Sequence, residues 1–597
     1  MNSVESIRQK IITSLGQALA SLQQDGTINV DDLPLAELEV PREKQHGDFA
    51  TNIAMTMAKK ARMNPRQLAQ KIVDRFDRTG TWVQDIQIAG PGFINFALDH
   101  RWLYPVLVHV QAEDHAYGTS DAGQGKRVQV EFVSANPTGL LHMGNARGAA
   151  LGDTLANLLR AAGFDVQKEF YINDAGNQIE NFAKSLEARY LELLGHDVIF
   201  PEEGYHGHDI IETMQGLIAR DGDRYVQMET AERRAALVAY GLQEKIGAIR
   251  QTLANFGVEY DVWFSEKTLH ESGAIQETLE TLRTNGYVDE NEGAQWFKAT
   301  AFGEEKDEVL VRSNGIPTYF AADIAYHKNK FDRGFDWVIN IWGADHHGHV
   351  ARMKNAVQAV GYPPEDLDVI LMQLVRLFKG GEIVRMSKRT GQYITLEELM
   401  EEVGKDAARF FFVMRGADSH LDFDLDLAKS QSAENPVYYV QYAHARICSI
   451  LRTAQDAGAA VPRVASAPAS MPSSCGLTGC GSCDVSGTSL TSLLKAAPAA
   501  PDNIDLTVLT HPSELALLRK IADLPDEVAR AAMQMEPHRM ARYAQDLAAL
   551  FHAFYTHCRV LNDDPALQQA RLLVVDDTRI VLRNVLHWLG LTAPERM

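Results

Sequence analysis

Apolar and polar residues alternate in RVQVEFV (127–133), which places Val128, Val130 and Phe132 on one face of a strand and Glu131 on the other. Two further short apolar runs, WVINIW (337–342) and LDVILMQL (367–374), also predict strands. Helical stretches separate these runs. Strands that alternate with helices predict an α/β fold with a parallel sheet and crossover helices.

The flanks of this region follow other patterns. Residues 1–115 combine helical periodicity with a strand-like close, IQIAGPGFINFAL, whose GPG marks a turn, and so predict a small α+β domain. We expect the α/β domain to span 116–404, with a polar and mostly helical insertion at about 175–310. From 405 to 597 the pattern predicts an all-α domain. Its segment at about 455–505 is rich in Ala, Ser, Gly and Pro, which favours a flexible, solvated insertion.

Composition and charge narrow the functional class. Apolar residues make up 45% and charged residues 23% of the 597 residues, which is ordinary for a globular protein. The net charge of −21 (58 − 79) excludes a uniformly basic nucleic-acid coat, although it leaves local basic faces possible. Neither a signal peptide nor a membrane-length apolar run is present, so we expect a cytoplasmic location and no membrane partner.

The cysteines cluster in CGLTGCGSC, where Cys475, Cys480 and Cys483 include a CxxC spacing. A zinc knuckle needs four ligands, and no fourth Cys or His lies nearby. We therefore interpret them as incidental thiols and predict no protein metal site. A metal at the adjacent His346 and His347 is also disfavoured, because neighbouring side chains on a loop point apart.

The turn after the first strand carries the first candidate chemistry. Glu131 lies near the carboxyl end of its strand, where ligands of open α/β sheets bind. A helix is expected to begin near Gly144, and its free backbone N–H groups attract phosphate. His142 and Asn145 would add side-chain donors there. The alternative is a strand-to-helix turn whose polar residues only cap the helix.

A second candidate element follows far downstream, in GGEIVRMSKRTGQYITL. The loop presents Arg385, Lys388 and Arg389 together with the Ser387 hydroxyl. Such a loop can close over a triphosphate and neutralise the charge that builds on a leaving pyrophosphate. The alternative is an ordinary solvated basic turn.

These two motifs resemble the signatures of class I aminoacyl-tRNA synthetases: PTGLLHMGN resembles HIGH, and RMSKR resembles KMSKS. The similarity extends over almost the whole chain and points to the arginyl-tRNA synthetase family. EVPREKQHGDFATNIAM (39–55) resembles its N-terminal tRNA-binding domain, WGADHHGH its nucleotide-side loop, and KDAARFFFVMR the DALR element of its anticodon-binding domain. The resemblance implies a Rossmann-type catalytic domain, and only the insertion near 455–505 falls outside it.

The resemblance also implies roles for individual residues. The HIGH-region motif would comprise Ala135, Asn136, Pro137, Thr138, Gly139, Leu140, Leu141, His142, Met143, Gly144 and Asn145. ATP would be bound by Thr138, Gly139, His142, Gly144, Asn145, Gly343, Asp345, His346, Met386, Ser387 and Lys388. The catalytic groups would be His142, Asn145 and Lys388. Arginine would be held by Glu131, Ser134, Asn136, Tyr319 and Asp323.

Tyr319 and Asp323 stand four residues apart after Thr318, a plausible helix start, and therefore share one helical face. A carboxylate can bind a guanidinium through two parallel hydrogen bonds, and a phenol can stack on the same planar group. Without the resemblance, a simple surface pair on a helix is an equal alternative. Two departures from the family pattern stand out: Asn145 replaces the second His of HIGH, and Arg385 and Arg389 replace Lys and Ser of KMSKS.

The implied reaction is ATP-dependent activation of L-arginine to arginyl-adenylate, followed by transfer to the 3′ end of tRNA(Arg). Mg²⁺ would arrive with ATP, and a monomer is the family expectation. Three alternatives remain open at this point: another class I synthetase, a small nucleotidyltransferase that uses the same signatures, and a non-catalytic tRNA-binding paralogue. We also expect the C-terminal helices to present Arg539, Arg542, Tyr543, Arg559, Arg579 and Arg583 to RNA.

Overall fold

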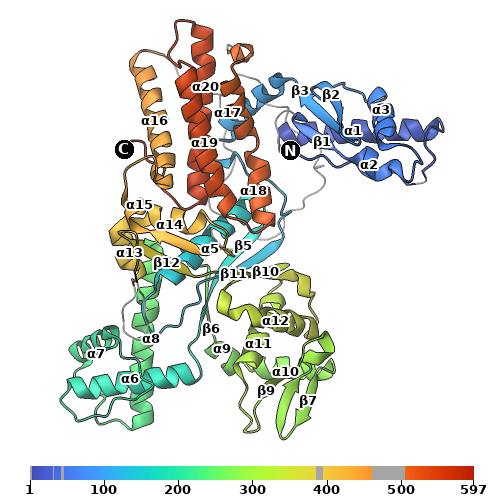
Figure 1. Ribbon diagram of the computed structural model, residues 1–597. Coiled ribbons are helices and arrows are strands. Elements are labelled where there is room, and N and C mark those ends of the chain that lie inside the picture. The colour runs from blue at the N-terminus through green and yellow to red at the C-terminus, as the bar shows by residue number, and fades with distance from the viewer. Residues whose placement is uncertain (1–2, 31, 42–45, 385–393, 460–503) are drawn as a thin grey trace, which may run out of the picture.

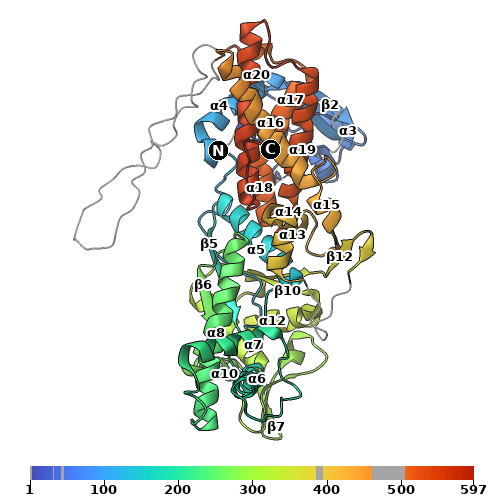
Figure 2. The same cartoon turned by 90° about the vertical axis from the view of Figure 1, so that its left-hand side faces the viewer.

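The computed structural model describes residues 3–30, 32–41, 46–384, 394–459 and 504–597. The molecule is elongated (Figures 1 and 2), with the N-terminal domain and the C-terminal helices at one end, the parallel sheet in the middle and two inserted lobes at the other end. Met386, Ser387, Lys388 and the cysteine cluster at Cys475, Cys480 and Cys483 lie outside the described residues, as does most of the predicted insertion.

The central sheet has five parallel strands in the order β11-β10-β4-β5-β6. They are β4 (Arg127–Glu131), β5 (Asp165–Ile172), β6 (Val262–Ser265), β10 (Trp337–Gly343) and β11 (Leu367–Met372). In chain order this is 5-4-1-2-3, the order of a doubly wound Rossmann-type sheet. The order reverses between β4 and β10, and a ligand crevice is expected at their carboxyl ends.

Helices cover both faces of this sheet (Figure 1). Helix α5 (Met143–Ala161) packs against the face formed by Val128, Val130 and Phe132, all at most 1% exposed. Helices α11 (Tyr319–Asp332) and α12 (His347–Ala359) lie on the Glu131 side. The predicted alternation of β4 is therefore confirmed: its two faces contact different helices.

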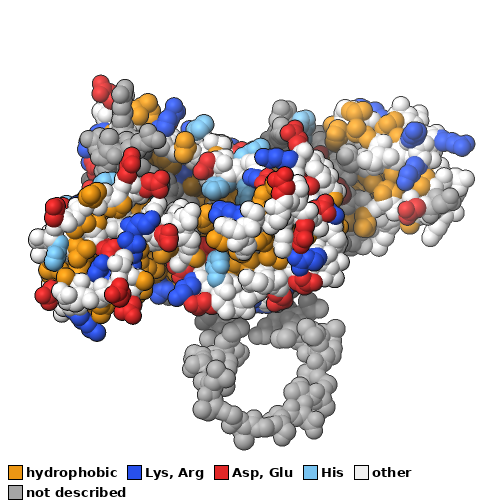
Figure 3. Space-filling view, turned by 90° about the horizontal axis from the view of Figure 1, so that it is seen from below, with side chains coloured by type: hydrophobic (Ala, Val, Ile, Leu, Met, Phe, Trp, Pro, Cys, Tyr) orange, Lys and Arg blue, Asp and Glu red, His pale blue; other side chains and the backbone are white. Residues whose placement is uncertain are grey.

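The insertion forms two lobes. Helices α6 (Asn177–Leu193), α7 (His208–Asp221) and α8 (Thr230–Asn255) enclose their own apolar cluster. The second lobe contains α9 (Lys267–Glu271), α10 (Ala274–Thr284) and an antiparallel sheet of β7 (Val288–Asn291), β8 (Ala294–Phe297) and β9 (Glu308–Val311). Figure 3 views this end from below and shows acidic and basic side chains interspersed across it.

The prediction of a mostly helical insertion over 175–310 was therefore incomplete, because this segment also returns β6 to the parallel sheet. β6 has only four residues, all partly exposed, and a run this short carries too little periodicity to identify a strand.

The N-terminal domain combines α1 (Ser3–Gln24), α2 (Ile53–Ala58) and α3 (Pro65–Asp74) with an antiparallel sheet of order β1-β3-β2. Its strands are β1 (Phe49–Thr51), β2 (Val83–Ala89) and β3 (Phe93–Leu98), and the predicted GPG turn joins the last two. Helix α4 (Tyr104–Glu113) then lies against the C-terminal helices, where Gln111 donates to Asp577 at 2.6 Å.

After the central sheet, β12 (Val375–Lys379) and β13 (Glu382–Ile383) lead to the second signature, and α13 (Leu396–Val403) and α14 (Lys405–Val413) follow it. The short strand β14 (Leu421–Asp424) pairs with β12, so the segment expected to be all-α contains one short strand after α14. The remaining elements are α15 (Leu425–Lys429), α16 (Pro436–Asp456), α17 (Pro512–Ala522), α18 (Leu524–Met533), α19 (His538–His557) and α20 (Pro565–Trp588).

One prediction for these helices was wrong. Tyr543 is only 1% exposed and donates its hydroxyl proton to the Lys520 carbonyl, so it offers no ring surface to RNA. Arg579 and Arg583 each donate to a carboxylate at 2.7 Å, to Asp576 and Asp114 respectively. Among the described residues, no helix is both long enough and apolar enough to cross a membrane.

Candidate functional site

A hollow of about 400 Å³ opens at the carboxyl ends of β4 and β10, where the strand order reverses. Side chains from β4, β5, α11, β10 and α12 surround it. The lining residues are Glu131, Tyr171, Tyr319, Phe320, Asp323, Tyr326, His327, Trp342, Asp345, His346, Gly348, His349 and Arg352. The structure thus brings together five of the predicted site residues, namely Glu131, Tyr319, Asp323, Asp345 and His346. The volume suits a small ligand.

The turn after β4 is conformationally constrained. Val133 and Ser134 have φ values of +69° and +38°, in a backbone region that residues other than glycine rarely adopt. The Ser134 hydroxyl donates to Glu131 at 2.8 Å and accepts the Tyr171 N–H at 3.1 Å. The surrounding structure therefore holds a strained turn, which is common at binding sites. Asn136, further along this turn, is exposed and does not line the hollow.

Helix α5 begins with a capping box. The Gly144 N–H donates to His142 Nδ1 at 3.1 Å, and the His142 N–H donates to Asn145 Oδ1 at 3.0 Å. The capping interpretation of these two residues is therefore correct, and it does not exclude phosphate binding. Because Nδ1 accepts, a neutral His142 ring carries its proton on Nε2, and the Asn145 amide nitrogen remains a donor.

The contact with His142 explains why glycine stands at position 144. A Cβ atom at this position would lie 3.0 Å from His142 Cε1, so glycine makes room for the capping imidazole. Thr138 and Gly139 are partly exposed in the turn before the helix. Leu141 accepts the Leu396 N–H at 2.9 Å, which joins the first signature to the segment that follows the second.

Arg147 was not identified from the sequence. Its guanidinium is fully buried and donates to the carbonyls of Gln373, Gly416 and Ser419 at 2.7–2.9 Å. It therefore ties the start of α5 to the segments that flank β12 and β14. An arginine two residues after the signature, on a helix otherwise rich in alanine and glycine, is the only sequence signal.

On α11, Thr318 caps the helix as predicted, and Tyr319 is half exposed. Asp323 lies one turn further on and is contacted by two imidazoles: His349 Nε2 at 2.7 Å from Oδ2, and His327 Nδ1 at 3.4 Å from Oδ1. Partial removal from water raises the pKa of Asp323, but hydrogen bonds from His327 and His349 outweigh this and hold the pKa well below its ordinary value. Asp323 is therefore a fixed anion at neutral pH.

At the other end of the hollow, Glu131 is held by a buried cation. Lys330 Nζ lies 2.5 Å from Glu131 Oε2 and also donates to Asn340 at 2.8 Å. Both Lys330 and Asn340 are 0% exposed. Sequence analysis did not identify these residues, although Lys330 stands seven residues after Asp323 and so shares its side of the helix.

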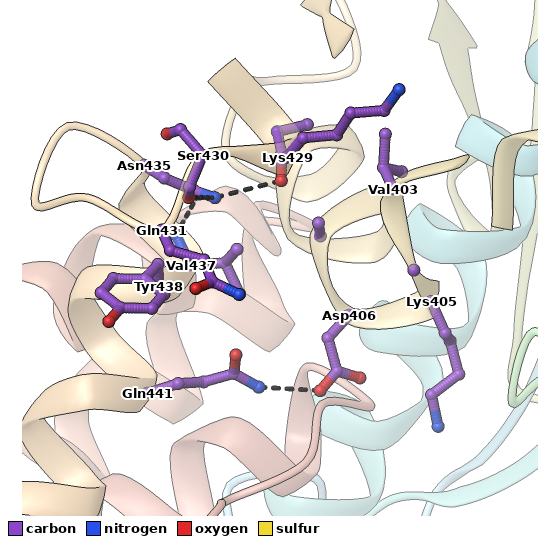
Figure 4. A pocket seen from close by; sticks show the side chains of 13 residues that line it. Val403, Lys405, Asp406, Lys429, Ser430, Gln431, Asn435, Val437, Tyr438 and Gln441 are labelled. Carbon is purple, nitrogen blue, oxygen red and sulfur yellow. Dashed lines mark hydrogen bonds between the residues drawn. The ribbon is translucent and has the colours of Figure 1, made fainter. Parts of the chain in front are cut away.

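A second hollow of about 320 Å³ lies away from this site, between the loops that precede α14 and α16 (Figure 4). Its polar groups serve the packing of these elements. Gln441 donates to Asp406 at 2.7 Å, and Asn435 donates to the carbonyls of Ala428 and Ser430. This second hollow is therefore a weaker candidate for a ligand site than the hollow at the sheet.

Comparison with known proteins agrees with this architecture. Residues 9–98 match the arginyl tRNA synthetase N terminal domain, residues 107–416 the class I (R) tRNA synthetase catalytic domain, and residues 486–597 the DALR anticodon binding domain. The solved arginyl-tRNA synthetases of Thermus thermophilus and Plasmodium falciparum share the fold, with TM-scores of 0.71 and 0.70 at 24% and 16% identity. Each similarity covers 99% of this chain, and 100% and 99% of those chains.

Curated relatives are closer in sequence. The arginine--tRNA ligases of Heliobacterium modesticaldum and Moorella thermoacetica are 74% and 59% identical to this chain over 597 residues, and each match covers 100% of both chains. With all three domain models matched in order and this identity over the full length, the chain belongs to the arginyl-tRNA synthetase family of class I aminoacyl-tRNA synthetases.

Proposed function

We propose that this arginine--tRNA ligase binds L-arginine across the hollow at the sheet, with the guanidinium at Asp323 and the α-amino group at Glu131. The observation that carries the proposal is the pair of carboxylates that line one hollow, each beside a buried side chain: Lys330 at Glu131 and His327 at Asp323. In the overall reaction, ATP activates L-arginine to arginyl-adenylate, and the arginyl group passes to the 3′ end of tRNA(Arg), with release of AMP and diphosphate.

Asp323 suits a guanidinium because it remains charged and is anchored from the protein side by His327 and His349. Tyr319 would cover the planar group. A lysine ammonium is a point charge that cannot satisfy a two-pronged carboxylate contact, so the same geometry disfavours lysine. Ser134 would act by holding Glu131, and Asn136 would complete the α-amino and carboxylate contacts.

We assign ATP to the surface between the start of α5 and the end of β10. His142, Asn145 and the backbone of Thr138, Gly139 and Gly144 would meet the phosphates, because a helix N-terminus favours anions. Gly343, Asp345 and His346 would meet the adenosine. Met386, Ser387 and Lys388 would close over the triphosphate, with Mg²⁺ arriving as part of the ATP substrate.

The chemistry needs little covalent help. The arginine carboxylate attacks the α-phosphate, and pyrophosphate leaves; positioning and charge stabilisation supply most of the barrier reduction. His142 Nε2–H and the Asn145 amide would donate to phosphate oxygens, and Lys388 would stabilise the charge of the transition state. Proton transfer is not assigned to Asn145, because an amide does not titrate.

Steady-state kinetics test the signature assignment. Lys388→Ala is expected to lower the rate of adenylate formation by on the order of a hundredfold while the KM for arginine changes little. A raised KM with an unchanged kcat would contradict the assignment. ATP–pyrophosphate exchange, measured with single amino acids and with or without tRNA, separates arginine activation from a non-catalytic tRNA-binding role, and we expect exchange to require tRNA(Arg).

For tRNA binding, the C-terminal helices offer a better surface than Tyr543. Tyr438 and Tyr442 of α16 stack at 6.1 Å, Tyr442 stacks on His552 at 6.2 Å, and Arg446 lies over the Tyr555 ring. The Tyr442 and Tyr555 rings are exposed, and exposed rings can stack on bases splayed from a loop. We further propose that the protein acts as a cytoplasmic monomer, with domain boundaries near 115 and 404.

A further inference from the structure

Three side chains beneath the hollow join the two carboxylates of the proposed arginine pocket. Lys330 contacts Glu131 at 2.5 Å and Asn340 at 2.8 Å. The Asn340 amide nitrogen lies 2.8 Å from His327 Nε2. His327 Nδ1 lies 2.8 Å from the Asp323 carbonyl oxygen and 3.4 Å from its carboxylate. A continuous chain of contacts therefore runs from one end of the hollow to the other.

The direction of every hydrogen bond in this chain is fixed by Lys330. An ammonium has only donors, so the oxygen of the Asn340 amide must face it. The amide nitrogen then faces His327 Nε2 and donates to it. A neutral His327 must then carry its proton on Nδ1, which donates to the Asp323 carbonyl oxygen at 2.8 Å and lies 3.4 Å from the Asp323 carboxylate. The tautomer and position of the His327 ring beside the Asp323 carboxylate are thus set from the Glu131 end.

Water cannot replace these contacts. Lys330 and Asn340 are 0% exposed and His327 is 1% exposed, whereas the Asp323 side chain is one-third exposed toward the hollow. A buried polar group that loses its partner pays the full desolvation cost, so each link holds the next in place. A well-packed apolar layer would serve stability as well. Stability alone therefore does not account for this chain.

We propose that His327, Asn340 and Lys330 are positioning residues that couple the guanidinium end of the pocket to the α-amino end. The inference rests on the proposed arginine pocket. Through this coupling, a change at the Glu131 end alters the guanidinium site, although the altered residue touches neither Asp323 nor the guanidinium.

An arginine analogue that lacks the α-amino group, 5-guanidinopentanoic acid, isolates this coupling because it keeps the guanidinium and the carboxylate but cannot make the α-amino contact with Glu131. The full-length enzyme is assayed by aminoacylation for the KM of arginine, the KM of ATP and the inhibition constant of the analogue. Lys330→Met removes the hydrogen bonds that Lys330 donates to Glu131 and Asn340. We expect the inhibition constant of the analogue to rise about fivefold or more, the loss of roughly one hydrogen bond, with the KM of ATP within twofold of native.

Asn340→Asp is the second variant. It keeps the shape of the side chain and the contact with Lys330, but it presents an acceptor to His327 Nε2 and so disturbs the proton at Nδ1. The same rise in the inhibition constant is expected. Trp337→Phe is the matched control. Trp337 lies on β10, the strand that carries Asn340, and the variant removes one partly buried hydrogen bond, from the indole N–H to Asp368 at 2.9 Å. This control should leave both arginine and analogue binding native.

The outcomes separate the two proposals. If Asp323→Asn leaves the inhibition constant of the analogue native, the proposed pocket is wrong. If Asp323→Asn weakens the analogue while Lys330→Met and Asn340→Asp do not, the pocket holds and the coupling is wrong. If the last two variants weaken ATP and analogue equally, their role is only structural, and the coupling is again overturned.

Discussion

On one face of the parallel sheet, α5 packs small apolar residues against Val128, Val130 and Phe132; on the other face, α11 meets the sheet through charged and amide side chains. The α5 face includes one buried ion cluster, in which Asp153 contacts Lys168 and Arg409. The α11 face has a buried ion pair of Lys330 with Glu131, and a second pair in which the partly exposed Arg333 meets the buried Glu169.

The difference separates two tasks. Apolar packing is non-directional and fixes where a helix lies, which suits α5, because only its first turn has to meet the ligand. Buried hydrogen bonds are directional and fix how individual side chains point, which suits the helix that carries Tyr319 and Asp323. We therefore expect substitutions on the α5 face to act mainly on stability, and those on the α11 face to act on arginine recognition.

The largest effect is expected for Asp153→Asn. Asp153 is 3% exposed and bridges Lys168 at 3.0 Å and Arg409 at 2.6 Å, so the variant leaves two buried cations without an anion. A loss of about 3–5 kcal/mol is expected. Thermal unfolding measures this loss of stability. Because the fold as a whole is weakened, activity toward arginine and toward ATP should be lost together. Asp165→Asn is the control, because Asp165 is largely exposed in its pair with Arg127. Equal midpoints for the two variants would contradict the prediction.

The same ion cluster has a pH signature. Burial raises the pKa of Asp153, but the ion pairs with Arg409 and Lys168 outweigh it and lower the pKa below its ordinary value. A carboxyl with a lowered native pKa contributes stability above its unfolded pKa of about 4 and loses it as the pH falls. The difference in unfolding midpoint between native protein and Asp153→Asn should therefore shrink in acid. A difference that stays constant down to pH 3 would argue against the ion pairs.

Asp323→Asn tests the α11 face and is expected to cost about 3 kcal/mol in arginine recognition, over a hundredfold in kcat/KM. The amide places a donor where the guanidinium also donates. Aminoacylation at saturating ATP and tRNA measures the effect, and the unfolding midpoint should change little. Asp332→Asn, at the end of the same helix, should behave like native protein. Near-native efficiency of Asp323→Asn would mean that the guanidinium is held elsewhere.

A pair of glycines on α5 sharpens the comparison. A Cβ at Gly152 would lie 2.2 Å from Phe132 Cγ, whereas one at Gly148 would meet its nearest neighbour, Met372, at 3.7 Å. Gly152→Ala should destabilise the protein by about 1–3 kcal/mol through overpacking. Gly148→Ala should be neutral or slightly stabilising, because alanine favours a helix. The thermal unfolding midpoints of the two variants test this difference. Equal midpoints would mean that α5 can shift to accommodate the Gly152→Ala methyl group at little cost.

The smallest effect is expected at the start of α11. Thr318 caps this helix by accepting the Ala321 N–H and also donates to the Val309 carbonyl at 2.8 Å. Thr318→Ala should cost about 1 kcal/mol and raise the KM for arginine a few-fold, because Tyr319 and Asp323 follow within two turns. Thr318→Ser keeps the hydroxyl and should restore the native KM. Failure of serine to rescue would assign the effect to the lost methyl group.

Local sequence patterns were sufficient for much of the fold and for part of the site. The alternation in RVQVEFV set the two faces of β4, the GPG turn joined β2 to β3, and Thr318 started α11. Tyr319 and Asp323 were correctly expected on one helix, because a spacing of four is a local property of helical geometry. The motif resemblance identified the family, which the comparisons confirm.

Other features depended on contacts between distant segments. The strand β6 is recognisable only by its pairing with β5, since its four residues have no distinctive periodicity. Tyr543 shares the apolar stripe of α19 with Leu547 and Phe551, so helical periodicity could have predicted its burial, whereas its hydroxyl partner, the Lys520 carbonyl of α17, depended on tertiary packing.

The sequence by itself therefore determined which residues are candidates for the chemistry: a helix start with His142 and Asn145, and a helix with Tyr319 and Asp323. Tertiary structure alone decided what surrounds them. His349 of α12 contacts Asp323, Asn340 of β10 contacts His327, and Glu131 of β4 contacts Lys330. These contacts form only because the three elements pack against α11. Periodicity reports which face of an element is buried, but the partner of a buried polar side chain depends on which elements pack together.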